Sequence, residues 1–391
     1  MMRSVRWKTT IFALLSVVLV TIAVLIGWGW HVSNKLRDGV LKPKRGVCPL
    51  DLEVVDFEKD QITLRATPQT QRDAWRRDGI WGLRWKEGYA QVGEILHMDD
   101  QKVVRKFLPL SGNLKHLDKV RLDEFAFPDD PQKAFGLPTQ KVVFSSPLGD
   151  FHALYIQGRS STWVIFVHGK RGHPPRKPLR SYPTLPAVTE LGLHCLIITY
   201  RNDLGAPASP DGFHWYGLSE WRDLEGAARY AVEHGAEKLI LVGYSMGGAI
   251  VMNFLHRSPL TKKVQVTILD SPMLDINSTI DFRARLLNIP EPIVWLGKFI
   301  AGLRFEIDWE ALDYLSRAHE LVTPILLFHG DADTIVPVET SDVLANVRPD
   351  IVTYHRVPYA THVRSWNMNP SAYETAVIDF MQEKGTPQIE H

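Results

Sequence analysis

This 391-residue sequence has very little cysteine and no marked excess of charge of one sign. It has two cysteines, Cys48 and Cys195, which cannot build a disulfide framework or a cysteine-rich zinc site. It also lacks H-E-x-x-H and C-x-x-C patterns, so we expect no metal and no cofactor. Lys and Arg number 45 against 44 Asp and Glu. Because nucleic-acid-binding proteins normally carry a strong basic excess, this balance argues against a nucleic-acid partner.

What the sequence does contain is typical of a large globular protein. Hydrophobic residues make up 45% and charged residues 23%, which excludes disorder as the main state. The length exceeds one ordinary domain of about 100–200 residues but fits one large α/β domain with additions.

The first 45 residues differ in composition from the rest. They hold eight basic residues and one acid, Asp38, around a stretch from Thr9 to Trp30 that has no charge. About 20 apolar residues in a helix can cross a bilayer. A core helix would show a polar stripe, and a cleaved signal would show a small-residue cleavage site. Neither is present, so we predict a retained transmembrane signal anchor at residues 11–30.

This anchor implies a basic flank at residues 1–10, a juxtamembrane linker at 31–48 and a single-pass membrane protein. Trp28 and Trp30 stand where an interfacial aromatic belt would lie. Three basic residues precede the apolar run and five follow it, which favours a cytoplasmic C-terminal part, although export of that part stays open.

The remaining sequence divides into two regions. Residues 49–135 alternate short strand-like runs with charged and aromatic stretches and carry no chemical motif, so we expect a β-rich accessory region. Residues 136–385 alternate continuous apolar runs with helical stretches, which predicts a mostly parallel sheet with helices on both faces. The apolar runs lie at 163–167, 195–200, 239–242, 264–269 and 324–328, after a hairpin that turns at Pro147–Asp150.

One stretch of about fifty residues interrupts this alternation. At residues 275–322 apolar side chains keep helical spacing, as in Leu296, Phe299, Ile300 and Leu303. Its length fits a helical lid inserted over one end of the sheet. The alternative is a helix that is simply buried in the core.

A G-Y-S-M-G-G motif at residues 243–248 carries the main chemical signal. It follows an apolar strand run and precedes a helical stretch at 249–256. In that setting a G-x-S-x-G motif forms a nucleophile elbow, in which small neighbours allow a sharp turn that lifts the serine hydroxyl clear of the sheet. We therefore predict Ser245 as a nucleophile rather than a turn serine.

A serine nucleophile needs a base, expected on a loop after the last strand. Residues 351–357 read as that strand, and P-Y-A-T-H-V-R follows, so His362 is the predicted base. His355 lies within the strand and is expected to pack there. His168 follows another strand and is expected to order its own loop.

An acid must hold the imidazole of the base in the correct tautomer. The stretch F-H-G-D-A-D-T-I-V-P at 328–337 supplies two carboxylates, and Asp333 is the better candidate because it lies beyond the turn. Asp331 is interpreted as a turn-forming residue, and Asp270 stays open as a substitute. The order Ser245, Asp333, His362 is the one expected for an α/β-hydrolase.

The oxyanion hole requires two backbone N–H donors. Met246, next to the serine, would supply one. The second would come from the loop at residues 167–170, where Lys170 is the candidate and Gly169 allows a close approach.

These motifs together resemble the α/β-hydrolase superfamily. They are F-V-H-G, Y-R-N-D, G-Y-S-M-G-G, H-G-D-A-D-T-I-V-P and A-T-H-V-R-S-W, and they cover roughly residues 141–384. The sequence is most similar to the membrane-anchored serine esterase, lipase and acylaminopeptidase-like branch of actinobacteria. One departure is A-T-H where that family often has G-x-H. The resemblance implies a Ser245–His362–Asp333 triad with Met246 and Lys170 as oxyanion donors.

The expected activity is that of a serine hydrolase acting on a carboxylic ester or thioester, in the manner of a carboxylesterase or lipase, with a small-molecule or lipid-like substrate. A peptidase or an acyltransferase would use the same triad, so both stay open. A membrane-anchored binding protein on a hydrolase fold is the alternative from another class. Serine at the elbow argues against dehalogenases and epoxide hydrolases, whose nucleophile is aspartate.

Overall fold

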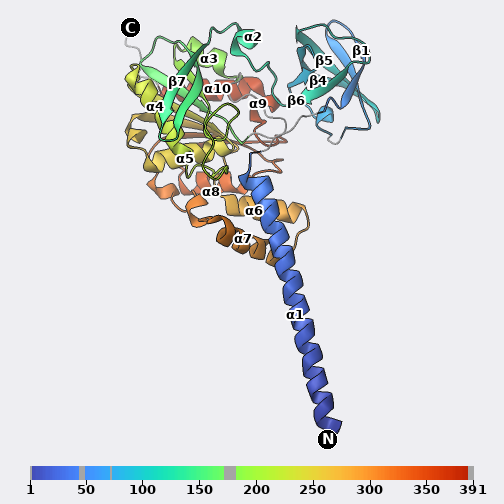
Figure 1. Ribbon diagram of the computed structural model, residues 1–391. Helices are drawn as coiled ribbons and strands as arrows, with labels where there is room; N and C mark the ends of the chain where they lie inside the picture. Colours follow the sequence, from blue (N-terminus) through green and yellow to red (C-terminus); the bar gives the residue numbers. More distant parts are fainter. Residues whose placement is uncertain (1, 44–48, 71–72, 171–181, 386–391) are drawn as a thin grey trace. The chain divides into compact units, whose positions relative to one another are not determined.

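The computed structural model describes residues 2–43, 49–70, 73–170 and 182–385 (Figure 1). The predicted linker residues 44–48, Cys48 among them, lie outside the described residues. The chain divides into two compact units. One joins residues 1–42 with 275–313, and the other joins residues 43–274 with 314–391.

The first unit is helical. It consists of α1 (Met2–Leu36), a π-helical turn (Arg37–Leu41), α6 (Ile276–Leu286), α7 (Glu291–Phe305) and a 3-10 turn (Glu310–Leu312). The 35 residues of α1 extend over about 52 Å at 1.5 Å per residue. By length and composition α1 can cross a membrane.

The stretch predicted as a lid forms the helices that its spacing indicates. Asp275 caps α6 by accepting hydrogen bonds from the backbone of Asn277 and Ser278, at 2.8 and 3.2 Å. An isolated β-bridge joins Asp275 to Asp313 and closes the segment at its base. The helical segment thus ends at residue 313, and residues 314–322 belong to the second unit.

Residues 52–123 of the second unit form a closed antiparallel barrel, which agrees with the β-rich character of the sequence. Its strands are β1 (Leu52–Phe57), β2 (Gln61–Ala66), β3 (Trp81–Arg84), β4 (Tyr89–Met98), β5 (Lys102–Ser111) and β6 (Lys119–Asp123), in the order β1-β2-β5-β4-β3-β6. A 3-10 turn (Asp73–Arg76) lies between β2 and β3. Alternate residues point inward, and three tryptophans, Trp75, Trp81 and Trp85, fill the core.

The largest fully buried side chain in the barrel is charged. The Arg105 guanidinium donates to three backbone carbonyls, of Gly93, Trp75 and Gly79, at 2.9–3.0 Å. Burial lowers its pKa to about 10, so it stays protonated at neutral pH. These bonds offset the cost of burying the charge and tie β5 to the β2–β3 connection.

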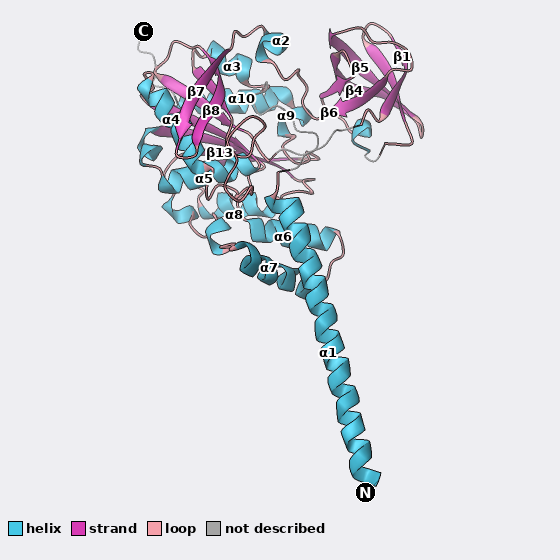
Figure 2. Ribbon diagram, viewed as in Figure 1, coloured by secondary structure: helices cyan, strands magenta, loops and turns pink. Residues whose placement is uncertain are grey.

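The main sheet has eight strands (Figure 2, magenta). They are β7 (Gln140–Ser146), β8 (Gly149–Ile156), β9 (Thr162–Val167), β10 (His194–Ile198), β11 (Lys238–Tyr244), β12 (Val264–Asp270), β13 (Ile325–Gly330) and β14 (Val352–Val357). The order is β14-β13-β12-β11-β9-β10-β8-β7, and β7 and β8 pair antiparallel while the other six strands run parallel. The strands begin and end within a few residues of the predicted runs.

Helices pack on both faces of this sheet. They are α2 (Pro131–Phe135), α3 (Leu185–Glu190), α4 (Trp221–Glu233), α5 (Met246–Arg257), α8 (Glu339–Val347), α9 (Ser365–Met368) and α10 (Pro370–Phe380), with short turns at Pro259–Lys263, Ala318–Glu320 and Met381–Gly385. One face shares a core with α3 and α10, and α4 packs against α5 on the sheet. The chain leaves β9 for β10 and then crosses to β11 on the other side, so the sheet has its topological switch point there.

Candidate active site

Ser245 stands at the turn between β11 and α5, next to the switch point. Its backbone has φ 52° and ψ −117°, a strained conformation for a residue other than glycine. A Cβ on Gly247 would clash with the carbonyl oxygen of Val167, and one on Gly248 would lie 2.5 Å from Cβ of Pro272. The glycines of the motif are therefore required for the helix to start this close to the sheet.

The three residues predicted as a triad lie together. His362, on the loop after β14, places Nε2 2.8 Å from Ser245 Oγ. On the other side of the ring, Asp333 Oδ2 accepts from His362 Nδ1 at 2.7 Å. Asp333 lies on the loop after β13, so three strand ends contribute one residue each. This geometry allows a proton to move from the hydroxyl to the imidazole.

The Asp333 carboxylate is fixed on both oxygens. Its Oδ1 accepts from the backbone N–H groups of Ile335 and Val336, at 2.7 and 3.0 Å. Its Oδ2 also lies 3.2 Å from Nε2 of His329, a fully buried residue of β13. Burial alone would raise the pKa of Asp333, but His362 and His329 outweigh it and hold the pKa below its usual value. The carboxylate is therefore charged at neutral pH.

His329 is a residue that sequence reasoning did not single out. Its Nδ1 lies 2.7 Å from Ser341 Oγ at the start of α8, so both ring nitrogens have partners. It shares Asp333 Oδ2 with His362 and helps to hold that carboxylate in place. The signal available in the sequence was its place in H-G-D-A-D, four residues before the acid.

The other candidate acids and bases have different partners. Asp331 is exposed and accepts from the backbone of Tyr359 at 2.6 Å, which fits its interpretation as a turn residue. His355 lies within β14 and stacks on Phe328 at 5.0 Å. His168 Nε2 contacts Asp203 Oδ2 at 2.8 Å.

The loop after β9 approaches the nucleophile closely. A Cβ added to Gly169 would lie 2.8 Å from the Ser245 Cβ, so only glycine fits there without displacement. Lys170 follows it, and its Nζ lies 5.7 Å from the ring centre of Tyr216. Met246 is the first residue of α5. Met246 thus follows Ser245 in the chain, and Lys170 follows the glycine that approaches it; their roles as oxyanion donors stay predictions.

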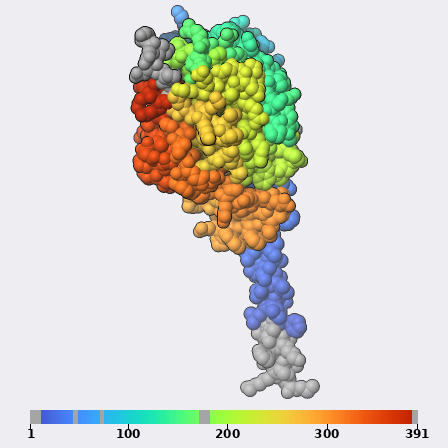
Figure 3. All heavy atoms as spheres, turned by 90° about the vertical axis from the view of Figure 1, so that its left-hand side faces the viewer, coloured from blue at the N-terminus to red at the C-terminus, as the bar shows by residue number. Residues whose placement is uncertain are grey.

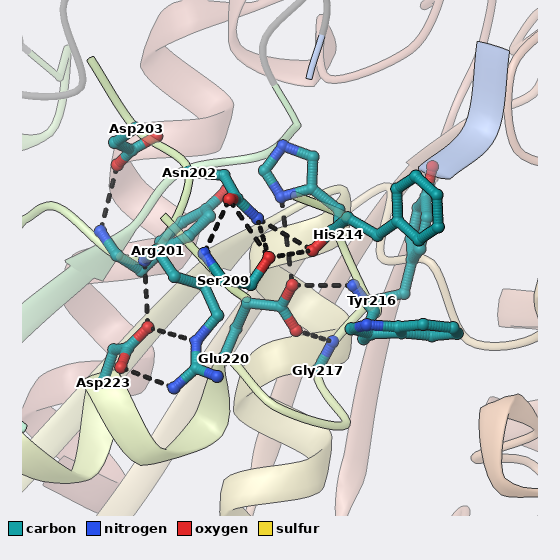
Figure 4. A network of polar contacts seen from close by, with 12 residues as sticks. Arg201, Asn202, Asp203, Ser209, His214, Tyr216, Gly217, Glu220 and Asp223 are labelled. Atoms are coloured by element: carbon teal, nitrogen blue, oxygen red, sulfur yellow. Dashed lines mark hydrogen bonds and ion pairs between the residues drawn. The ribbon is translucent and has the colours of Figure 1, made fainter. Parts of the chain in front are cut away.

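The loop after β10 is held by two buried carboxylates (Figure 4). Glu220 accepts from the backbone of Trp215 and Gly217 at 2.7 and 3.0 Å, while Asp223 accepts two bonds from the Arg201 guanidinium at 2.8 Å each. Burial raises the pKa of Glu220. The Y-R-N-D motif therefore serves to fix this loop, which packs on the helix that follows the nucleophile.

The loop that follows His362 is bound to the barrel region. The Asn367 side chain donates to the backbone oxygens of Ile80 and Glu124, at 2.6 and 3.2 Å, and its own carbonyl accepts from the Ile80 backbone at 2.8 Å. Arg364 forms an ion pair with the Glu124 carboxylate. Sequence reasoning found no role for residues 49–135; these contacts join them to the segment that follows His362.

Asp270 is buried behind the site. Its carbonyl accepts from the Ser245 backbone at 3.0 Å, and its carboxylate accepts from Ser365 at 3.1 Å. It borders a cavity of about 40 Å³, together with Tyr244 and Tyr373. That volume is far below the roughly 300–1,000 Å³ of ligand pockets. Asp270 makes no contact with His362 comparable to that of Asp333, which argues against the substitute acid.

Burial raises the pKa of Asp270 to about 6, from 3.8 in the unfolded chain. The unfolded state therefore loses its proton first, and the stability that the neutral form contributes is present below about pH 4 and lost as pH rises through about 6. Two pKa units correspond to about 3 kcal/mol. We expect Asp270→Asn to raise the thermal unfolding temperature above pH 6 and to change it little near pH 4.

Differential scanning fluorimetry in detergent, from pH 4 to 8, measures the thermal unfolding temperature of the wild type and of Asp270→Asn. The matched control is Asp331→Asn, an exposed carboxylate, which should leave the pH profile unchanged. An Asp270→Asn variant that is less stable than wild type at pH 8 would contradict the prediction.

Comparisons with known proteins agree with this architecture. A family model described as serine aminopeptidase, S33, matches residues 214–307, and one described as a domain of unknown function matches residues 53–123. The uncharacterized protein YfhR of Escherichia coli K12 is 21% identical over 228 residues, which cover 58% of this chain and 72% of that protein. YfhR of Salmonella typhimurium is 23% identical over 289 residues, covering 68% and 89%.

Solved structures resemble the chain at low sequence identity. A Pyrococcus furiosus esterase is 19% identical, with a TM-score of 0.51 over 66% of this chain and 96% of that one. A Pyrococcus horikoshii acylaminoacyl peptidase is 15% identical, with a TM-score of 0.52 over 87% and 57%. A puromycin-hydrolyzing peptidase of Mycobacterium tuberculosis is 14% identical, with a TM-score of 0.51 over 86% and 63%.

The sheet order, the elbow and these likenesses define the α/β-hydrolase fold. This chain therefore has the α/β-hydrolase fold, and a serine aminopeptidase family model matches part of it.

Proposed function

We propose that this protein is a membrane-anchored serine hydrolase that cleaves a carboxylic ester or thioester through an acyl-enzyme. One observation carries the proposal, namely the continuous contact from Ser245 Oγ through His362 to the Asp333 carboxylate at 2.8 and 2.7 Å. A serine hydroxyl is a weak nucleophile unless such a base takes its proton.

The chemistry follows from these positions. Ser245 Oγ attacks the substrate carbonyl while its proton passes to His362 Nε2, and Asp333 stabilises the imidazolium. The N–H groups of Met246 and Lys170 would donate to the developing oxyanion. The leaving alcohol or thiol then takes the proton from His362. In the second half, water gives a proton to His362 and attacks the acyl group. The bond between the acyl carbon and Ser245 Oγ then breaks, Ser245 takes the proton back from His362, and the acid is released.

A fluorophosphonate probe combined with a substrate panel tests the proposal. We expect the probe to label Ser245, located by peptide mass spectrometry, and p-nitrophenyl esters to be hydrolysed. An unlabelled serine and an inert protein would instead support the binding-protein alternative.

A peptidase is the second candidate function. The serine aminopeptidase family model and the likeness to an acylaminoacyl peptidase over 87% of this chain favour it. An aminoacyl or acylaminoacyl anilide beside the ester panel separates the two, because an esterase would turn over only the activated esters efficiently. Acyl transfer is detected by adding an alcohol acceptor and analysing the products.

We further propose that the substrate is lipophilic and is met at the membrane. The apolar helix α1 would hold the enzyme beside membrane-partitioned substrates and raise their local concentration. The segment 275–313 is rich in Leu, Ile, Phe and Trp. Together these features favour an ester with an apolar acyl chain over a small polar one.

We therefore expect kcat/KM to rise with acyl chain length. Each buried methylene contributes about 0.8 kcal/mol, roughly a fourfold gain, until the pocket is full. The measurement uses the full chain in detergent micelles with p-nitrophenyl esters of increasing length, kept below their aggregation limits. A maximum at the shortest esters with a steep fall beyond would contradict the lipophilic substrate and leave the proposed triad unaffected.

A further inference from the structure

The helix α7 packs one of its faces against the C-terminal part of α1. A Cβ on Gly297 would clash with the Val32 side chain, and one on Gly29 would lie 2.6 Å from Cγ of Leu296. Glycines facing each other's helix in this way let two helix backbones approach closely, as in membrane helix pairs. Figure 3 shows the segment that contains α7 in orange against α1 in blue.

A polar contact fixes the same pair of helices. The Arg304 guanidinium lies 3.6 Å from the ring centre of Trp30 and donates to Ser33 Oγ and Asn34 Oδ1, both at 3.0 Å. The close contacts at Gly29 and Gly297 and the two hydrogen bonds of Arg304 together define the position of α7 along α1. The two helices therefore form one body within this unit.

A neighbouring side of α7 is apolar and exposed. Trp295, Phe299 and Leu303 recur at four-residue spacing and are 63%, 51% and 70% exposed, and the two aromatic rings stack at 5.6 Å. Leu286, the last residue of α6, and Leu287, which follows it, are 52% and 67% exposed. We call these five side chains the apolar face of α7. Large exposed apolar side chains concentrated in one segment are typical of an interaction site.

The position along α1 at which α7 makes contact indicates what covers the apolar face of α7. Every side chain of α1 from Phe12 to Trp28 is exposed, and the first buried residue is Gly29, where α7 makes contact. Those 17 residues extend over about 25 Å, close to the roughly 30 Å of a bilayer core. The contact with α7 therefore begins where the free apolar run ends, beside Trp28 and Trp30.

The charges near this face suit a lipid surface. Arg283 and Arg285 are exposed in the last turn of α6, next to Leu286. Lys298, which lies between Trp295 and Phe299 in sequence, is paired with Asp281 at 2.7 Å and adds no free charge. Glu291, one turn before Trp295, is an exposed acid. The exposed arginines of α6 and the exposed Trp, Phe and Leu of α7 are side chains of the kinds found at the interface of an anionic membrane.

We propose that the apolar face of α7 inserts into the headgroup–acyl boundary of the membrane that α1 crosses, as a second membrane contact of the same unit. The proposal rests on the proposed span of α1. The occupant is an anionic lipid bilayer, and the close packing of α7 on α1 brings the face to the bilayer surface without a further conformational step.

Site-directed fluorescence on the full chain tests it. In a Cys48→Ser background, where Cys195 is fully buried, single variants Trp295→Cys and Leu303→Cys carry an NBD label. Leu19→Cys in α1 is the reference for the span, and Leu117→Cys in the barrel is the aqueous control. Their exposures, 63%, 70%, 65% and 63%, are matched. The proteins are placed in phosphatidylcholine–phosphatidylglycerol vesicles with and without lipids that carry a nitroxide near the headgroup.

We expect blue-shifted emission and strong nitroxide quenching at positions 295 and 303, and neither effect at position 117. If position 19 is quenched while 295 and 303 behave like 117, the inference is wrong and the span stands. If position 19 is not quenched either, the proposed span fails, and the inference fails with it. Blue-shifted labels at 295 and 303 that lipid nitroxides do not quench would mean a protein cover, such as a second copy, and would also overturn the inference.

Discussion

Replacement of Ser245 by alanine is expected to abolish ester hydrolysis and fluorophosphonate labelling while leaving the fold unchanged. Loss of the nucleophile in a serine-hydrolase triad typically lowers kcat by on the order of 10⁶. The side chain of Ser245 contacts His362 and does not cap α5, so its removal takes away no structural hydrogen bond. Alanine has the same backbone preferences at this strained turn, which keeps the elbow intact.

The matched control is Ser219→Ala. Ser219 Oγ is buried and has no hydrogen-bond partner among the described residues. This variant loses a buried hydroxyl without touching the candidate site, so it should keep wild-type kcat. The rate of p-nitrophenol release measures the activity of both variants, and thermal unfolding measures their stability. Activity near wild type in purified Ser245→Ala would rule out Ser245 as the nucleophile.

The sheet could be predicted from the sequence because its central strands are buried on both faces. A parallel strand in that position reads as a continuous apolar run, and all six residues of β9 and of β13 are buried. The candidate catalytic residues were predictable for a related reason. Ser245 and Asp333 follow such runs, and His362 follows the edge strand β14, all at the side of the sheet where the carboxyl ends of the parallel strands meet.

The contacts that support the site could not be predicted. His329 lies inside a strand, and its place in H-G-D-A-D does not indicate which partners its ring nitrogens contact. Asn367 and Glu124 are separated by more than two hundred residues, and their hydrogen bond depends on how the barrel region meets the sheet. The pairing of α7 with α1 is equally distant in sequence, and its only local sign is two glycines among many.

The Asp333→Asn variant is expected to lower kcat by about 10⁴, the loss found when the orienting acid of a serine protease is replaced by its amide. The surroundings of Asp333 determine which way the new amide would point. Backbone N–H groups of Ile335 and Val336 donate to Oδ1, so the carbonyl oxygen of asparagine occupies that side. Its NH₂ group then faces Nδ1 of His362. A donor there forces the imidazole proton onto Nε2, which can no longer accept the proton of Ser245.

Asp331→Asn is the control for this result. Asp331 Oδ1 accepts one bond from the Tyr359 backbone, and an asparagine oxygen accepts the same bond, so activity should stay near wild type. Measurement of kcat and KM separately is informative, because the wrong tautomer lowers kcat and leaves substrate binding unchanged. A pH profile adds a further test, since added hydroxide partly replaces the base and raises the residual rate at high pH. If Asp331→Asn proves the more damaging of the two, or Asp270→Asn does, the carboxylate that orients His362 is another one, and the tautomer argument fails with it.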